Sequence, residues 1–219
     1  MKAAILSTIL MGVTLVTACS IDAYEKGDGE YSLMTAEMVD ATVGSDKYVT
    51  TVDTDEGERL MLNAPVKTEW MEKGDTTYRA LLYYNAMEGG KIEAISFNKV
   101  GVLIPANEKN NGKIDSLKTD PLYVESIWMS KNKKYVNMRL RLLTGAADDE
   151  KAVHTLGLFR DTTAYHGHEH FTLYHHQGSR PEYYSTTVFV SIPLAKVQTD
   201  TLTIVANTYD GPFSRTFIK

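Results

Sequence analysis

The chain has 219 residues, of which 23 are Lys or Arg and 28 are Asp or Glu, and its formal net charge is −5. This acidic balance argues against a nucleic-acid-binding protein, which would carry a basic face, so no nucleic-acid partner is expected. Cys19 is the single cysteine, which excludes an internal disulfide and a cysteine-based metal site. The length allows two small domains or one large β domain.

The first 18 residues have the pattern of a secretory signal peptide. Lys2 precedes an apolar stretch, residues 3–16, that is too short for a membrane span, which takes roughly 20 apolar residues. Val16-Thr17-Ala18-Cys19 resembles the lipobox of bacterial lipoproteins, in which the cysteine is lipidated and becomes the first mature residue. The resemblance implies that acylated Cys19, carrying palmitate-type chains, anchors the protein in the lipid bilayer of the cell envelope, at the outer membrane. A plain signal peptide cut nearby is the alternative.

Residues 19–30 are polar and predict a lipidated tether, and residues 31–106 show the period of two that is typical of strands. One strand pair flanks the polar turn 53–57. A second pair, residues 77–86 and 91–104, flanks Gly89-Gly90, where glycine supplies the positive φ of a tight reversal. A helix over residues 80–87 is a weaker interpretation because this segment is rich in Tyr and is stopped by Gly89-Gly90. Short strands in this number suit a small closed barrel.

Residues 107–119 are rich in Asn and Lys, with few apolar residues, and predict a linker. Residues 120–219 form a second β region, whose strands at intervals of about 8–15 residues predict an antiparallel sandwich. In one of these strands the side chains alternate between two faces, with Val136, Met138, Leu140 and Leu142 on one and Tyr135, Asn137, Arg139 and Arg141 on the other. The expected fold class is all-β.

Several segments of the second half share their order and spacing with one known family. They are Asp120-Pro121-Leu122-Tyr123-Val124-Glu125-Ser126-Ile127-Trp128, Tyr135-Val136-Asn137-Met138-Arg139-Leu140, Leu173-Tyr174-His175-His176, Val188-Phe189-Val190-Ser191-Ile192-Pro193-Leu194 and Asn207-Thr208-Tyr209-Asp210-Gly211. Together with the lipobox they resemble the NigD-like lipoproteins of Bacteroidetes. The resemblance implies an N-terminal OB-like barrel followed by a C-terminal β-sandwich, and it brings no catalytic residues.

Histidines are the one group of residues in a spacing that suits metal chemistry. His166, His168 and His170 alternate with other residues, so a strand would place their imidazoles on one face, an arrangement that can hold zinc. Glu169 would point away from them, and Asp161 or Glu182 could approach from neighbouring strands.

A solvated loop is the simpler interpretation of the same histidines, because Asp161–Gly167 is turn-like and Gly167 weakens a strand. The three histidines are therefore weak metal candidates, and no metal or other cofactor is expected. We expect His175-His176 to be structural.

No catalytic motif is evident. Ser179 lacks a Gly-x-Ser-x-Gly context, and no phosphate-binding Gly-rich loop opens a helix. We expect a non-enzymatic envelope lipoprotein that binds or assembles with a partner, either an envelope protein or a glycan. The alternatives are a glycan-binding accessory protein, suggested by Tyr174, Tyr183 and Tyr184, and a metal-binding protein or metal-dependent enzyme using the residues from His166 to His170.

Asp-Ser/Thr pairs followed by Leu or Thr resemble the O-glycosylation signal of exported Bacteroidetes proteins. The sites implied by this resemblance are Thr76, Ser116, Thr162 and Thr201. The same dipeptides are good turn formers, because short polar side chains bond to their own backbone. Both interpretations place these residues between strands.

Overall fold

The computed structural model describes residues 34–106, 117–146, 152–161 and 167–219. None of the helical segments in these ranges is both long and apolar enough to span a membrane. The described elements are strands and two short 3₁₀ turns, η1 (Glu88–Gly90) and η3 (Leu194–Lys196). The strands are β1 (Thr35–Val43), β2 (Val49–Thr54), β3 (Arg59–Val66), β4 (Thr76–Ala86), β5 (Lys91–Lys99), β6 (Gly101–Val102), β7 (Pro105–Ala106), β8 (Tyr123–Met129), β9 (Tyr135–Thr144), β10 (Thr155–Arg160), β11 (His168–His176), β12 (Tyr184–Pro193), β13 (Thr201–Thr208) and β14 (Gly211–Ile218).

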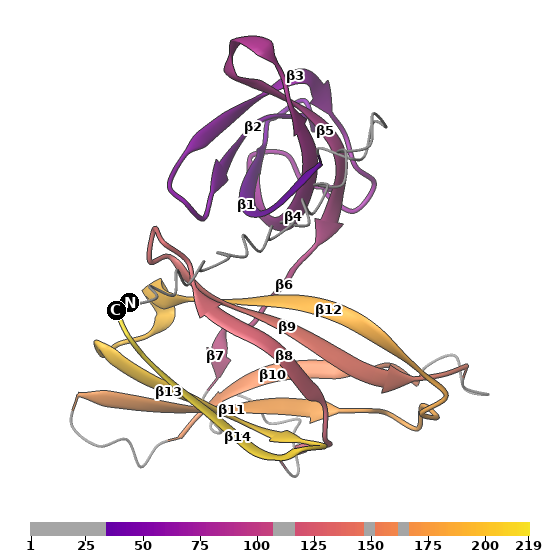
Figure 1. The fold of residues 1–219 in the computed structure, drawn as a ribbon, viewed down its shortest axis with the longest axis vertical. Helices are drawn as coiled ribbons and strands as arrows, with labels where there is room; N and C mark the ends of the chain where they lie inside the picture. Colours follow the sequence, from indigo (N-terminus) through magenta and orange to yellow (C-terminus); the bar gives the residue numbers. More distant parts are fainter. Residues whose placement is uncertain (1–33, 107–116, 147–151, 162–166) are drawn as a thin grey trace, which may run out of the picture. The chain divides into compact units, whose positions relative to one another are not determined.

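The first five strands close into a barrel with the order β1-β2-β3-β5-β4, which leaves no free edge (Figure 1). The predicted hairpins are present as the antiparallel pairs β2–β3 and β4–β5, and the parallel pair β3–β5 completes the closure. Gly89 and Gly90 have φ values of 79° and 75° between β4 and β5, as the sequence predicts. Alternate residues fill the barrel, and its core includes Val39, Ala41, Val52, Leu82 and Phe97.

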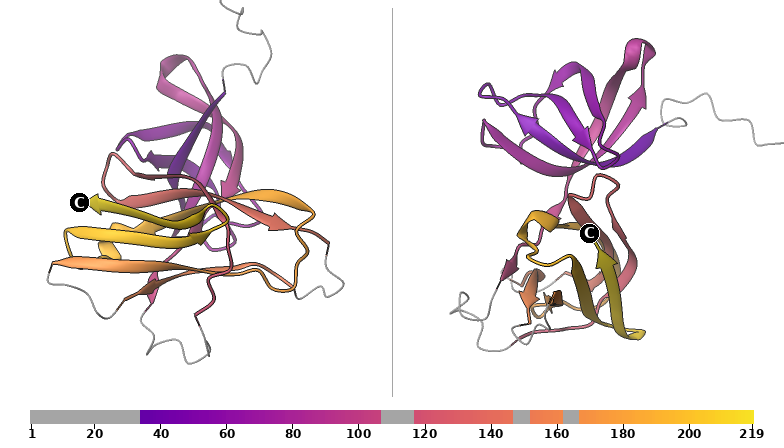
Figure 2. Two further views of the ribbon diagram at one scale, coloured as in Figure 1. Left: turned by 60° about the horizontal axis from the view of Figure 1, so that its bottom comes forward. Right: turned by 90° about the vertical axis from the view of Figure 1, so that its left-hand side faces the viewer.

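The remaining strands form a sandwich of two sheets, seen as two layers in Figure 2. One sheet has the order β14-β13-β11-β10-β7 and the other has the order β6-β12-β9-β8. Most pairs are antiparallel, and β11–β13, β10–β7 and β12–β6 are parallel. The first parallel pair arises because β12, which lies between β11 and β13 in the chain, belongs to the opposite sheet. The predicted all-β fold, a barrel followed by a sandwich, is confirmed.

Strand β9 has the two faces that its sequence predicts. Val136, Met138 and Leu140 are fully buried in the core between the two sheets. Asn137 on the other face is also fully buried, whereas the side chain of Arg139 is half exposed. The outer face of β9 is therefore covered at one end only, and what covers it is the barrel.

The sandwich begins earlier in the chain than residue 120. The sequence predicts one barrel strand over residues 91–104, but β5 ends at Lys99, and Gly101–Val102 pairs with β12. Val100 is buried at the crossing, and its N–H donates to the Arg79 carbonyl at 3.2 Å. A Cβ atom at Gly101 would lie 3.2 Å from the Val190 side chain, so glycine permits this close pairing.

The predicted linker lies inside the sandwich sequence. Pro105–Ala106, which precedes it, pairs with β10, and Thr119, at its end, bridges to His175. Both flanks of the segment thus belong to the sandwich, and its residues 107–116 lie outside the described residues. Barrel and sandwich are part of one compact unit, Met34–Lys219.

Candidate functional site

A buried guanidinium joins the barrel to the sandwich. Arg79 projects from β4 with only 2% of its side chain exposed, and its Nη2 donates to both carboxylate oxygens of Asp55, at 2.7 and 2.6 Å. Its Nη1 lies 3.3 Å from the Asp40 carboxylate of β1. Nε and Nη2 also donate across the domain boundary, to Ser191 Oγ on β12 and Asn137 Oδ1 on β9, both at 3.1 Å. Four side chains from both domains thus satisfy one charge.

The sandwich partners of Arg79 are themselves held in place. Ser191 Oγ donates to Asn137 Oδ1 at 2.7 Å, and Asn137 Nδ2 donates to Asp55 at 2.6 Å. The Tyr135 ring lies 4.0 Å from the Arg79 guanidinium carbon, a cation–π contact. Burial, followed by the nearby Asp40 carboxylate, raises the pKa of Tyr135 to about 12. The network is closed, so its groups are occupied with one another rather than available to a ligand.

An apolar cluster lies beside this network. It consists of the buried Met38, Leu81 and Val100 with the half-buried Tyr83, Trp128 and Phe189. Barrel and sandwich both contribute, through β1 and β4 on one side and β8 and β12 on the other. The contact between the domains therefore combines a buried ionic network with a small hydrophobic patch.

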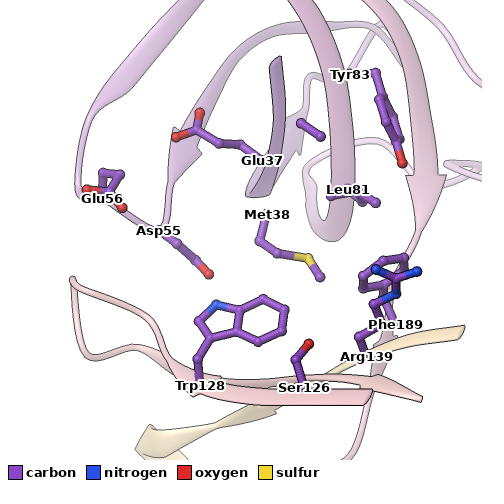
Figure 3. A pocket seen from close by; sticks show the side chains of 11 residues that line it. Glu37, Met38, Asp55, Glu56, Leu81, Tyr83, Ser126, Trp128, Arg139 and Phe189 are labelled. Atoms are coloured by element: carbon purple, nitrogen blue, oxygen red, sulfur yellow. The ribbon is translucent and has the colours of Figure 1, made fainter. Parts of the chain in front are cut away.

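A cleft of about 460 Å³ opens next to the cluster (Figure 3). Its barrel wall comes from β1, β4 and the β2–β3 turn, and its sandwich wall comes from β8, β9 and β12. The lining residues are Ala36, Glu37, Met38, Asp55, Glu56, Leu81, Tyr83, Ser126, Trp128, Arg139 and Phe189. Figure 3 shows the Trp128 indole lying between the two walls, with its nitrogen toward Asp55. Among the described residues, none accepts a hydrogen bond from that nitrogen.

The acidic side chains of the cleft have internal partners. Asp55 is held by Arg79 and Asn137, and Glu56 pairs with Lys131 of the β8–β9 turn. Glu37 accepts a hydrogen bond of 3.0 Å from the Tyr84 hydroxyl. Burial and then this bond raise the pKa of Tyr84 to about 12.

Two arginine side chains lie on the sandwich side of the cleft: Arg139 lines it, and Arg141 lies next to Arg139 outside the lining. Arg139 and Arg141 lie two residues apart on the outer face of β9, and each places Nε on the carboxylate of Glu125, at 2.8 and 2.9 Å. The Arg141 guanidinium carbon lies 3.7 Å from the centre of the Tyr123 ring, which in turn stacks on Tyr209 at 4.9 Å. One carboxylate and the rings thus orient two guanidinium groups on the same face.

The structure brings two of the three candidate metal histidines together. His168 and His170 lie on one face of β11, with ring centres 4.3 Å apart, and His168 Nε2 is 2.8 Å from Thr203 Oγ1. Glu169 points the other way, as predicted, and its carboxylate lies 2.6 Å from Arg160 Nε. His166 lies outside the described residues. The described part of the chain contains no group of three or more metal-ligating side chains.

Glu182, which we expected near the histidines, has other partners. It accepts hydrogen bonds from the Tyr209 hydroxyl at 2.6 Å and from Gln177 at 3.2 Å. Asp161 has a backbone bond to the next strand, with its N–H donating to the His170 carbonyl at 2.9 Å. Glu182 is therefore bound in a different hydrogen-bond network from His168 and His170.

His175 is 1% exposed and forms a chain of hydrogen bonds. Its Nδ1 lies 2.9 Å from the Asp120 carbonyl, so it donates there, and its Nε2 accepts from His154 Nδ1 at 3.0 Å. Burial is the largest cause that lowers the pKa of both imidazoles. The charges of His175 and Arg180 lower the pKa of His154 further, and the charge of His176 does the same for His175. The pair links β11 to two other segments of the sandwich.

The tyrosines expected to stack on sugar do not form one surface. Tyr174 is only 8% exposed and packs against Phe159, whereas Tyr183 is 80% and Tyr184 58% exposed. Tyr174 belongs to β11 and Tyr184 to β12, which lie in different sheets. The three tyrosines that suggested the glycan-binding alternative therefore do not lie in one plane, because strand alternation turns Tyr174 into a packed position.

The candidate modification sites are only partly described. Cys19, Ser116 and Thr162 lie outside the described residues. Thr76 opens β4, and its hydroxyl donates to the Gly74 carbonyl at 3.1 Å, a turn contact of the kind predicted. Thr201 is the half-buried first residue of β13. O-glycosylation at these positions stays a prediction.

The sequence analysis missed the residues that build the cleft. It assigned Asn137, Arg139 and Arg141 to the outer face of β9 without a partner, and it did not single out Arg79. One signal was present, since Arg79 interrupts the apolar part of a barrel strand at Thr77–Leu82. A charged residue there is almost never fully buried unless it is paired.

Comparisons with known proteins place these features in context. The model of the "NigD-like C-terminal beta sandwich domain" family matches residues 103–218. No curated protein matches the chain. A NigD-like immunity protein from Bacteroides caccae has a similar structure, with a TM-score of 0.65 and 22% identity over 84% of this chain and 96% of that chain. A candidate lipoprotein from Bacteroides fragilis is also similar, with a TM-score of 0.60 and 14% identity over 84% and 96%. At these identities the two structures show a shared fold.

Replacement of Arg79 tests whether its network holds the two domains together. Arg79→Met leaves Asp55 buried without its cation and leaves Asp40 with Lys134 alone, whose Nζ is 3.8 Å away. Loss of one partner of a buried pair costs about 3–5 kcal/mol. We expect that loss in the free energy of unfolding, measured by urea denaturation. Arg59→Met is the matched control, because its ion pair with Asp53 is on the surface and 70% of its side chain is exposed. Equal effects of the two substitutions would contradict the assignment.

The buried His175 and the half-buried His154 predict a loss of stability in mild acid. Because the pKa values of His154 and His175 are lowered in the folded chain, the unfolded chain binds more protons below about pH 6.5, and the free energy of unfolding falls between pH 7 and pH 5. Asp120, whose pKa is lowered chiefly by the Gln177 N–H, contributes with the same sign only in stronger acid. In His175→Asn the pH dependence of the free energy of unfolding should shrink. Urea denaturation at both pH values checks this, and a His175→Asn variant with unchanged pH dependence contradicts it.

Proposed function

Because the chain belongs to the NigD-like family, we propose that it is an exported envelope lipoprotein that binds a ligand in the cleft between its barrel and its sandwich, without catalysing a reaction. The observation that carries this proposal is the cleft itself. It has a volume typical of ligand sites, which run from about 300 to 1,000 Å³, and its lining combines aromatic and aliphatic side chains with nearly as many polar and charged ones.

The way in which the cleft is built supports a binding role. The hydrogen bonds of Arg79 to Ser191 and Asn137 hold the barrel wall and the sandwich wall together, so the cleft is already formed before a ligand binds. A preformed site avoids part of the ordering cost of binding. Trp128 adds a large apolar surface with a free N–H group, a combination that is common where proteins bind partners.

The sequence supports the envelope location. Cys19 follows a signal-like segment in a lipobox-like setting, and stable anchoring takes more than one acyl chain. The similar Bacteroides fragilis structure belongs to a candidate lipoprotein. We propose anchoring through acylated Cys19, in the outer membrane, with the barrel and sandwich as the exposed functional part.

One relative suggests a class of partner. The Bacteroides caccae protein is named a NigD-like immunity protein. The immunity proteins of colicin nucleases, which share this designation, bind their partner proteins very tightly. A binding role for this chain, with an envelope protein or a glycan as partner, is in keeping with that name. The proposal does not depend on it, since the cleft accepts a small ligand or one residue of a larger partner.

A screen of small fragments tests whether the cleft binds. The chain has two tryptophans, and Trp70 is engaged inside the barrel, where its Nε1 donates to the Phe97 carbonyl at 3.1 Å. NMR spectra of the ¹⁵N-labelled mature chain therefore show two indole signals, which a Trp70→Phe variant assigns. We expect cleft ligands to shift the Trp128 signal and not the Trp70 signal.

Two neighbouring substitutions provide the control for that screen. Ala36→Phe fills the cleft and should weaken binding at least tenfold, because Ala36 lines it. Thr35→Phe adds the same side chain to the adjacent exposed residue of β1 and should leave binding unchanged. If no fragment of any charge shifts the Trp128 signal, the proposed binding role of the cleft is wrong.

Anchoring is tested separately by cell fractionation. Wild-type protein should sediment with the outer membrane and be extracted by detergent. Cys19→Ala should appear as soluble protein or as uncut precursor, because it lacks the thiol that carries the lipid. A wild-type protein found wholly in the soluble periplasm contradicts the lipid anchor and leaves the cleft proposal standing.

A further inference from the structure

Arg139 and Arg141 form a pair of guanidinium groups with one counter-charge between them. Both use Nε to bind Glu125, at 2.8 and 2.9 Å, so two positive charges share one carboxylate. Among the described residues, Arg141 donates one hydrogen bond, from Nε to Glu125, and Arg139 forms an ion pair with the same carboxylate through Nε. Their Nη groups, the outer donors of the guanidinium fork, remain for another acceptor.

The rest of the cleft has no comparable excess of positive charge. Asp55 is neutralised by Arg79, and Glu56 is paired with Lys131. Glu37 has a hydroxyl donor, Tyr84, rather than a cation, so the barrel wall keeps hydrogen-bond acceptors. The sandwich wall is therefore the side that attracts an anion, and the barrel wall suits hydroxyl or amide donors.

The rings next to the arginine pair provide an apolar surface. Phe189 lies opposite Arg139 on β12, with its ring centre 6.0 Å from the guanidinium carbon, and Ser126 lies opposite Arg139 on β8. Trp128 is two residues further along β8 and also lines the cleft. A ligand whose charge reaches Arg139 thus places its neighbouring atoms against aromatic rings.

We infer that the ligand of this cleft is a small oxyanion on a ring-shaped body, with a carboxylate or phosphate held by the Nη groups of Arg139 and Arg141 and the ring against Trp128 and Phe189. The inference rests on the proposed binding function and names its ligand class. Guanidinium forks match the geometry of both oxyanions, and such charge-assisted hydrogen bonds are roughly twice as strong as neutral ones. Glu37 accepts hydrogen bonds from hydroxyl groups on the ring.

Matched probes separate the charge from the ring. Phenyl β-D-glucuronide and phenyl β-D-glucoside differ in having a carboxylate or a hydroxymethyl group, and phenyl phosphate and phenol form a second pair for phosphate. We expect the anionic member of at least one pair to shift the Trp128 indole signal with at least tenfold higher affinity than its neutral partner. The pair that shows the preference identifies the oxyanion. Added salt should weaken the anionic probe only.

Variants of the arginines test the assignment of the oxyanion site. Arg139→Gln should reduce the affinity of the anionic probe to that of the neutral one, and Arg141→Gln should reduce it several-fold. Arg215→Gln on β14 removes an exposed arginine outside the cleft and should change nothing. The unchanged Trp70 signal reports that each variant is folded.

Each failure has a different meaning. Equal affinities within both probe pairs, or an anion preference that survives in Arg139→Gln, overturn the oxyanion inference. The same holds if other fragments shift the Trp128 signal and none of the four probes does, and in that case the proposed binding function stands. If neither the fragments nor the probes shift it, both the function and the inference are wrong.

Discussion

One buried charge determines how the domains of this protein meet. A guanidinium with 2% of its side chain exposed is stable only if its donors are satisfied, because an unpaired buried ion costs several kcal/mol. Arg79 finds two carboxylates in its own domain, but Nε and part of Nη2 depend on Ser191 and Asn137 of the sandwich. Moving the domains apart would leave Arg79 Nε and Nη2 without their acceptors on Ser191 and Asn137 at the same time. The contact is therefore specified by hydrogen-bond geometry as well as by apolar area.

The cleft follows from that contact. Along β9, Asn137 is sealed against the barrel, whereas Arg139, two residues further on the same face, is half exposed. The apolar cluster that includes Met38 and Trp128 lies beside the buried network and also lines the cleft. The side chains that fix the domains and those that line the cleft thus lie two residues apart on the same faces of the same strands, as Ser191 and Phe189 do on β12. A ligand site built in this way needs no loop closure, because its walls are strands of two rigid β structures.

The sequence predicted local structure well and long-range partners poorly. The alternation of β9 identified its buried face, because strand periodicity is a property of neighbouring residues. Its other face could not be assigned, since the partner of Asn137 is Arg79, 58 residues away. The strand expected over 91–104 divides at Val100 for the same reason. Its residues suit a strand throughout, but Phe97 of the first half packs in the barrel core and Leu103 of the second half packs in the sandwich core. The histidine spacing likewise gave the correct face for His168 and His170 without giving their neighbours.

Binding in this cleft is coupled to stability even when the structure does not change. A ligand that contacts both Trp128 of the sandwich and Glu37 of the barrel binds only while the two walls are together. It therefore stabilises the folded contact by mass action, by about 2.7 kcal/mol at a free concentration one hundred times Kd. That amount is close to the cost of disrupting one buried ion pair, about 3–5 kcal/mol. A ligand bound as proposed would thus stabilise the same interface that the Arg79 network already holds together.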